Sequence, residues 1–252
     1  MPPMHAFVTL RAGLVVLAAV AGVAACGPGS STASLGSGTT PAGTSVVAAP
    51  TSPSDDPDAG LRPGVQLKTA LPTLADLPRG FHVNAAGVQD SGTAFGADPT
   101  ATTLAHPDCR QLEGGNAWLT SLGQAPAFAQ TTYEDGKGDQ VFPEVDAYRG
   151  SGAKAVMAAY RRLFTTCRTF AYRDPQSGTK AMVSLKIESG PAVGDESLRA
   201  VLTTPAFEGG ITVVAVRVGR FVVTVYDNST TDVGAGAVGL ATGMARHTAA
   251  WR

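Results

Sequence analysis

Apolar and polar residues alternate in short runs along most of the second half of the chain, and this pattern predicts strands. The last run contains two alternating segments joined at Gly219-Arg220, which is typical of a tight hairpin. Both faces of this hairpin are apolar, so we expect it at the centre of a sheet. The predicted strands cover residues 81–85, 127–133, 140–149, 168–173, 180–188, 197–204 and 210–227.

Two of these runs should pair as a second hairpin. Residues 134–139 lie between them and read Glu-Asp-Gly-Lys-Gly-Asp, which favours a turn. The second arm contains Pro143, which cannot donate a backbone hydrogen bond to a neighbouring strand. We therefore expect an edge strand or a bulge at this position.

Two segments instead repeat apolar residues every three or four positions, which is the period of a helix. In residues 151–167 the stripe includes Val156, Tyr160 and Phe164. A second stripe covers residues 232–251, with Asp232 as the predicted N-cap. A shorter helix should begin near Pro107. Strands grouped with separate helices predict an α+β fold: one twisted antiparallel sheet of about six to seven strands, packed by two or three helices.

The N-terminus has the layout of a lipoprotein signal peptide, over residues 1–25. Arg11 is followed by an uncharged apolar run, and the segment ends in Val23-Ala24-Ala25-Cys26. These four residues resemble the bacterial lipobox, which predicts cleavage before Cys26 and lipidation (palmitate) of its thiol. The apolar run is shorter than the ~20 residues that a membrane-spanning helix needs. The alternative is an ordinary secretory peptide in which Cys26 is incidental.

Residues 26–62 differ in composition from the rest of the chain. They are dominated by Gly, Ser, Thr, Ala and Pro, and contain no aromatic residue. Such a segment buries too little apolar surface to offset its ordering entropy, so we expect a disordered tether. Residues 63–252 are then a single α+β domain, long enough for a substantial core.

The two remaining cysteines are Cys109 and Cys167. An even pair on an exported domain predicts a disulfide. The alternative is two free buried thiols. From residue 61 onward, 18 Lys/Arg stand against 17 Asp/Glu, and the chain contains no basic run. This balance argues against nucleic acid as a partner.

No motif for nucleophilic catalysis stands out. The pentapeptide Gly-x-Ser-x-Gly is absent. The stretch from Gly194 to Ser197 includes a serine and two acids, but we interpret it as a turn before a strand, with Asp195 bonding its own backbone. A pair of carboxylates for glycoside hydrolysis cannot be identified by spacing. The candidates are Glu134, Asp135, Glu144 and Asp146, and we expect them on a solvated sheet face or edge.

No metal site is expected. The mature chain has only three histidines, far apart in sequence: His82, His106 and His247. Asp135, Gly136 and Asp139 lack the 12-residue pattern of a calcium loop, so a hairpin turn is favoured. Nor does the chain contain a phosphate-binding Gly-x-x-x-x-Gly-Lys-Ser/Thr motif, and we expect no cofactor.

Several short motifs together resemble a known family. They are the lipobox and tether, Leu-Pro-x-Gly-Phe at 77–81, a cysteine on a short helix, a second at the end of a longer helix, Gly-Asp-Glu-Ser at 194–197, and a Val-rich hairpin at 213–225. The chain resembles actinobacterial lipoproteins related to the extracellular sensor domain of PknH-type kinases. The resemblance implies a twisted antiparallel sheet with a ligand-binding cleft and no catalytic residues. Many members carry two disulfides, whereas this chain has cysteines for one. PsbP-like lipoproteins are a second candidate family.

These observations predict a non-enzymatic, ligand-binding or sensor-like domain on the extracytoplasmic face of the cell membrane. Its expected partners are the membrane, through the N-terminal lipid, and a small molecule, a lipid or a cell-envelope component. One alternative is a protein-interaction module that serves an envelope complex. A hydrolase acting on the envelope is the third hypothesis.

Overall fold

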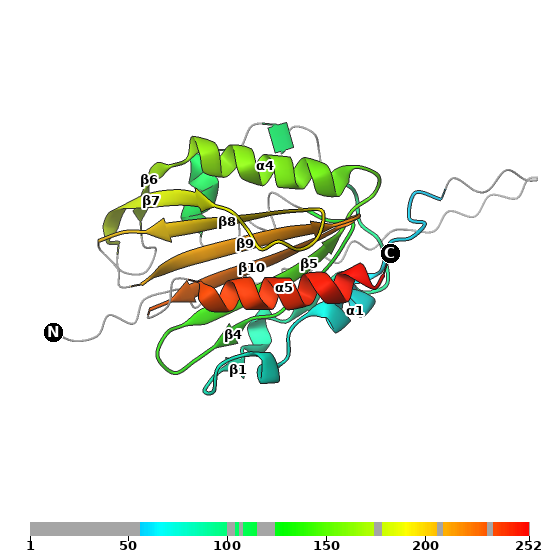
Figure 1. Cartoon of the computed structure of the whole chain (residues 1–252), viewed down its shortest axis with the longest axis horizontal. Coiled ribbons are helices and arrows are strands. Elements are labelled where there is room, and N and C mark those ends of the chain that lie inside the picture. The colour runs from blue at the N-terminus through cyan, green and yellow to red at the C-terminus, as the bar shows by residue number, and fades with distance from the viewer. Residues whose placement is uncertain are drawn as a thin grey trace, which may run out of the picture. The chain divides into compact units, whose positions relative to one another are not determined.

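The hairpin at the centre of the sheet lies where the alternating pattern predicts it. Strands β9 (Gly210–Val218) and β10 (Phe221–Ser229) pair from the turn onward, with Val218 opposite Phe221. Strand β10 also pairs with β5 (Gln140–Ala147), and β9 with β8 (Glu196–Thr203). The hairpin is therefore enclosed on both sides, and its side chains are buried on both faces of the sheet (Figure 1).

The computed structural model describes residues 56–99, 104–105, 108–114, 124–173, 178–205, 209–230 and 234–251. The predicted signal peptide, Cys26 and most of the predicted tether lie outside these residues, as do His106 and Asp232. Within the described residues, no helix is long and apolar enough to cross a membrane.

The sheet has ten strands in the described residues, more than the six to seven expected. The main order is β1-β4-β5-β10-β9-β8-β7-β6, every pairing is antiparallel, and β3 pairs with β2 and β5. The short strand β1 lies within the predicted strand at 81–85, whereas the short strand β2 was not predicted. Another additional strand arises because the predicted arm at 127–133 is split in two. The remaining bounds are β1 (His82–Val83), β2 (Gln89–Asp90), β3 (Ala127–Gln130), β4 (Tyr133–Glu134), β6 (Thr169–Arg173) and β7 (Lys180–Glu188).

Pro143 explains why β3 and β4 are separate strands. The backbone N–H of Thr131 donates to the carbonyl oxygen of Pro143 at 3.2 Å. The reciprocal bond cannot form, because proline has no N–H. The register is unchanged across the gap, since Gln130 faces Glu144 and Tyr133 faces Val141. The expectation of an edge strand or a bulge is therefore wrong: Pro143 lies inside the sheet and removes one ladder bond.

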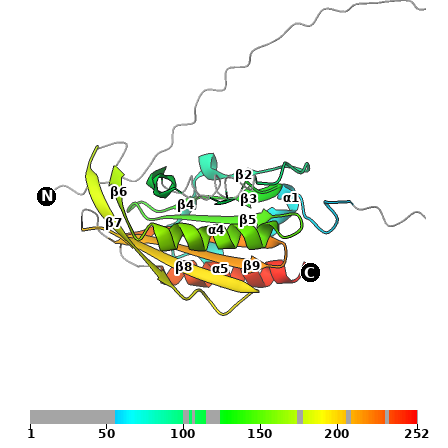
Figure 2. The same ribbon diagram turned by 90° about the horizontal axis from the view of Figure 1, so that it is seen from above.

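Helix α4 (Gly152–Thr166) matches the predicted helix and covers one face of the sheet. It connects β5 to β6, and strands β6 to β10 then return across the sheet until β10 lies beside β5. In Figure 2, α4 lies along the strands between β5 and β8. Its buried stripe includes Val156, Tyr160 and Phe164, which pack with inward side chains such as Val213 and Ala215 of β9.

A disulfide fixes the C-terminal end of α4. Cys167 follows the last helical residue and is bonded to Cys109, as predicted. Cys109 begins η4 (Cys109–Gly114), which is a 3₁₀ helix where an α-helix was expected. Gly114 ends this helix and Gly115 follows it in the sequence, and two consecutive glycines weaken any longer helix.

Helix α5 (Ala235–Ala249) covers the opposite face of the sheet, over β9 and β10. Its predicted stripe is confirmed in the described residues, with Ala237, Ala241 and Met244 buried. The helix is preceded by Gly234 in a left-handed conformation (φ 79°), where a Cβ would lie 2.3 Å from Thr212 Oγ1. The short helices of the N-terminal part are α1 (Gly64–Leu67), η1 (Lys68–Ala70), η2 (Leu74–Asp76) and η3 (Ala85–Gly87).

The described chain begins seven residues before the predicted start of the domain at residue 63. Residues 57–60 form a turn. Arg149, which follows β5, donates from Nε to Asp58 Oδ1 at 2.6 Å, and Arg220 donates to the carbonyl oxygen of Ala59 at 2.5 Å. The last residues of the predicted tether therefore contact the sheet.

Candidate ligand-binding pocket

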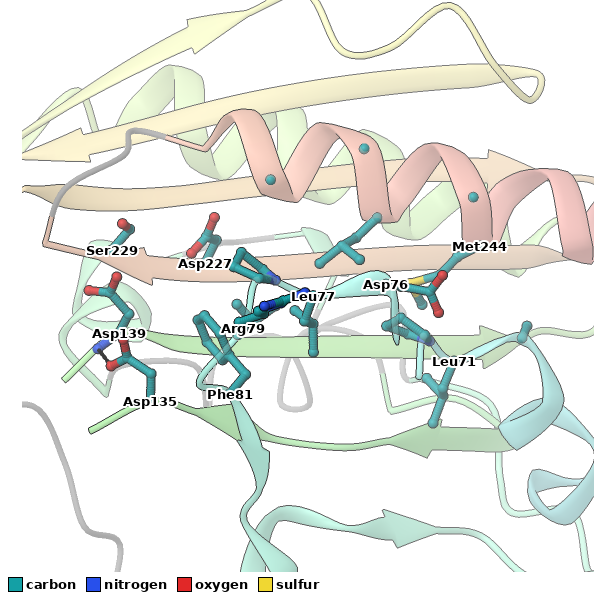
Figure 3. Close-up of a pocket in the computed structure, with 18 of the residues that line it drawn as sticks. Leu71, Asp76, Leu77, Arg79, Phe81, Asp135, Asp139, Asp227, Ser229 and Met244 are labelled. Carbon is teal, nitrogen blue, oxygen red and sulfur yellow. Dashed lines mark hydrogen bonds between the residues drawn. The ribbon is translucent and has the colours of Figure 1, made fainter. Parts of the chain in front are cut away.

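A pocket of about 780 Å³ opens beside α5. Four segments far apart in the sequence form its walls: residues 70–81, the β4–β5 hairpin, the end of β10 and one side of α5. Pockets for small molecules commonly measure roughly 300–1,000 Å³. This pocket is large enough for such a ligand, and its close-up is shown in Figure 3.

One end of the pocket carries apolar side chains beside Asp76. Leu71, Met244 and Asp76 lie at this end in Figure 3, with Leu77 toward the middle. The three apolar side chains continue the core between α5 and the sheet, together with Val141 and Leu240. A ligand with an apolar body would therefore contact side chains of this core.

Three glycines keep the α5 wall of the pocket open. Gly236, Gly239 and Gly243 are three and four positions apart, so they lie on one side of the helix. A Cβ added at Gly239 or Gly243 would meet no atom within 4 Å, and at Gly236 it would approach only Asp227 Oδ2, at 3.9 Å. Each glycine in a helix interior costs about 1 kcal/mol relative to alanine, and no close backbone contact requires the glycines at 239 and 243.

The other end of the pocket is acidic. Asp135, Asp139, Asp227 and Ser229 lie together there in Figure 3. Asp139 Oδ1 accepts hydrogen bonds from the backbone N and from Oγ1 of Thr230, each at 2.7 Å. The β4–β5 hairpin is thereby tied to the end of β10, which fixes the position of this carboxylate.

Asp135 holds the hairpin turn itself. Its Oδ1 accepts from the backbone N of Lys137 at 2.8 Å and from that of Asp139 at 3.0 Å. This is the hairpin turn that was favoured over a calcium loop. Within the described ranges, no group of three or more His, Cys, Asp or Glu side chains could hold a metal ion.

Residues 72–81 supply the wall opposite α5. Asp76 caps η2 by accepting from the backbone N and Oγ1 of Thr73, each at 2.8 Å, and the backbone bond is the larger cause of its lowered pKa. The hydroxyl of Tyr133 donates to the carbonyl oxygen of Pro72 and holds this segment against the sheet. Arg79 lies between the two ends in Figure 3, and no carboxylate of the described residues forms an ion pair with it. Its guanidinium can therefore bind an anionic group of a ligand.

The two histidines that the structure describes lie in different parts of the domain. His247 lines the pocket, and its ring contacts Trp251 at 5.6 Å between centroids. His82 is on β1, with Nε2 3.4 Å from Glu134 Oε1.

The four candidate carboxylates do not form one cluster. Asp135 lines the pocket, and Glu134 pairs with His82. Glu144 and Asp146 are buried on the α4 face, with exposed fractions of 6% and 2%. The expectation of a solvated sheet face is wrong for these two. The alternation of β5 identified which residues share a face, but it could not tell that this face is covered.

Gly194 and Asp195 lie in a bend directly before β8, whereas Glu196 and Ser197 are the first two residues of that strand, and the carboxylate of Asp195 bonds to the β9–β10 hairpin. Its Oδ2 accepts from Gly219 N at 2.7 Å and from Arg217 Nη1 at 2.8 Å. Ser197 Oγ donates to the carbonyl oxygen of Pro191 at 2.7 Å. The stretch therefore anchors the β9–β10 turn.

A scan against models of known protein families finds no match for this chain, and a search of curated proteins finds no similar sequence. Among solved structures, the extracellular domain of PknH from Mycobacterium tuberculosis matches with a TM-score of 0.49 and 11% identity. The match covers 75% of this chain and 93% of that one. This likeness is too distant to establish a shared fold or function, so the PknH-type resemblance stays a prediction.

The sequence predicted a ligand-binding cleft but not the residues that line it. The walls come from segments up to 177 residues apart, from Ala70 to His247, and their meeting depends on the whole sheet. One signal was present: a helix-period stripe with glycine at 236, 239 and 243. Glycine lowers helix propensity, so three in one helix indicate a reason other than local stability.

Proposed function

We propose that this protein is a lipid-anchored, extracytoplasmic binding protein, and that its domain binds a ligand in the pocket beside α5 without chemical conversion. The observation that carries the proposal is the pocket itself, about 780 Å³ in volume and left open by helix glycines at positions that could accept a Cβ. The lipobox-like residues before Cys26 support the location.

The lining supports a ligand with an apolar body and a polar head. The apolar end would contact the body through Leu71, Leu77 and Met244. The acidic end offers carboxylates, and the guanidinium of Arg79 lies between the two ends. A small molecule, a lipid or a cell-envelope component with this division satisfies both ends.

Mass spectrometry of molecules that co-purify with the native, lipidated protein tests the proposal. We expect a ligand with the wild type and its loss in Gly239→Leu, whose side chain would occupy the pocket. Ala249→Leu is the matched control, because Ala249 is exposed on the same helix and does not line the pocket. If all three proteins bound the same ligand equally, this pocket would not be its binding site.

A protein-interaction module is the second candidate. Four of the six large apolar side chains found exposed in the described residues lie between positions 65 and 88: Val65, Leu74, Val83 and Val88. Exposed apolar residues that form one contiguous patch are typical of contact surfaces. This function would be favoured if no ligand co-purified and Leu74→Ser weakened cross-linking to one defined envelope protein.

A further inference from the structure

Two carboxyl groups lie in the interior on the face of the sheet that α4 covers. Glu144 and Asp146 are two residues apart on β5, so their side chains share one face. Glu144 is 6% exposed and Asp146 is 2% exposed. The pair is on the face opposite the pocket, because Val141 and Val145, the odd-numbered neighbours, pack on the α5 side.

Among the described residues, no cation balances this pair. Neither carboxyl group forms a salt bridge with a Lys, Arg or His side chain there. Arg161 of α4 and Arg217 of β9 pair with Glu196 instead. The groups next to the pair are neutral: Tyr148 directly after β5, Tyr160 on α4, Val222, Thr224 and Tyr226 on β10, and Phe128 and Gln130 on β3. Taking an unpaired carboxylate out of water costs several kcal/mol, so burial strongly favours the protonated form.

The hydrogen bonds form a chain along the strand. Tyr148 donates to Asp146, and Asp146 bonds to Glu144. A bond between two carboxyl groups needs a proton on one of them. Burial raises the pKa of Glu144 to about 7, and burial followed by the charge of Glu144 raises the pKa of Asp146 well above its ordinary value.

We propose that Glu144 and Asp146 share a proton and form a pH-sensitive switch that controls how tightly α4 packs on the sheet. When both groups are protonated, the pair is neutral and hydrogen-bonded beneath Tyr160. Loss of the first proton leaves one negative charge and one shared proton, and loss of the second leaves two negative charges that face the phenol rings and the apolar residues of α4. Hydrating them requires water to enter beside the helix, which loosens its packing. This inference does not depend on the proposed ligand.

The direction of the pH effect follows from the raised pKa values. The folded protein holds the protons more tightly than the unfolded chain does. The stability that the pair supplies is therefore complete below the ordinary pKa of 4.5 for Glu144. This stability is lost as the pH rises toward 7, where Glu144 ionises, and more of it is lost where Asp146 ionises. Most carboxylates in folded proteins act in the opposite direction, since they stabilise the fold at higher pH.

Carboxyl carbon NMR of the whole domain tests the proton directly. At pH 6 we expect at least one of the two carboxyl groups to be protonated, whereas exposed acids are ionised. In the wild type, the equilibrium constant for unfolding should rise up to about tenfold per pH unit between roughly pH 5 and 7. Glu144→Gln is the comparison, and its unfolding constant should depend less on pH over this interval. Amide protection factors in α4 should fall over the same interval.

Two variants separate the switch from general pH effects. Glu144→Gln and Asp146→Asn keep the shape and a hydrogen-bonding group, and each should flatten the pH dependence of α4 protection. Glu134→Gln, on the neighbouring strand with a side chain 29% exposed, should retain it. The proposal is overturned if both buried carboxyl groups titrate near pH 4, or if α4 protection in the wild type is the same at pH 5 and pH 8.

Discussion

The carboxylate of Asp195 accepts a hydrogen bond at 2.7 Å from the backbone N–H of Gly219, 24 residues further along the chain. Gly219 is in the β9–β10 turn, in a left-handed conformation (φ 62°). The same carboxylate pairs with Arg217, whose Nε also binds Glu196 at 2.8 Å. The start of β8 is thereby fastened to the turn of the central hairpin.

Replacing Asp195 should therefore destabilise the domain. Asp195→Ala removes a charge-assisted bond to the turn and one partner of Arg217, whose side chain is only 12% exposed. We expect a loss of about 1–2 kcal/mol in the free energy of unfolding, measured by urea denaturation. Asp195→Asn should lose less, because its amide oxygen can still accept from Gly219. Asp98→Ala is a control, since Asp98 is 49% exposed and 3.5 Å from Arg149. An Asp195→Ala loss no larger than that of this control would contradict the anchoring role.

The disulfide should contribute more to the free energy of unfolding than Asp195 does. Cys109 and Cys167 are 58 positions apart, and closing a loop of that length restricts the unfolded chain by about 4 kcal/mol in a chain-entropy argument. The double variant Cys109→Ser/Cys167→Ser should lose stability of that order in thermal or urea unfolding. Adding a reductant to the wild type should reproduce the loss and leave the double variant unchanged. If a reductant did not lower the stability of the wild type in these unfolding measurements, the result would argue against this disulfide.

The parts of the fold that local pattern determines could be predicted. The apolar spacing of α4 and the alternation of β9 and β10 are set by which side chains must reach the core, so sequence periodicity records them. The pairing of β1 with β4 is different, since His82 faces Glu134 across 52 residues of chain. A strand at 81–85 was predicted from its alternation, but its partner was not, and the two-residue strand β2 carries too little pattern to identify.

Burial of polar groups was the main feature that the sequence could not predict. In β5, Glu144 and Asp146 alternate with Val145 and Ala147, as in a strand with one solvated face. The second face is covered because α4 carries the chain across it, which is a property of topology. The residues that line the pocket could not be predicted for a related reason, because its acidic end forms only when the β4–β5 hairpin meets the end of β10 through Asp139 and Thr230.

The lipobox-like motif gives a separate prediction about location. Cys26→Ser removes the thiol that would receive the lipid, so the protein should move from the membrane fraction into the medium. A single acyl chain gives only marginal membrane binding, whereas a diacylated cysteine anchors stably. The measurement is the distribution of the protein between cell membranes and medium. The Cys109→Ser/Cys167→Ser variant should remain with the membranes. Retention of Cys26→Ser in the membrane fraction would show that the motif does not anchor the protein.

The glycines of α5 predict that stability and ligand binding oppose each other in this domain. Gly239→Ala and Gly243→Ala add a methyl group where no atom lies within 4 Å, so each should raise the free energy of unfolding by about 1 kcal/mol through helix propensity alone. In a domain of this size, that corresponds to an increase of about 2–4 °C in Tm. The same methyl groups project into the pocket and should weaken binding of a co-purifying ligand. Gly234→Ala is the contrasting variant, because its positive φ and its contact with Thr212 should make it destabilising. If these replacements raised stability without loss of the ligand, the glycines would not be needed for binding in the pocket.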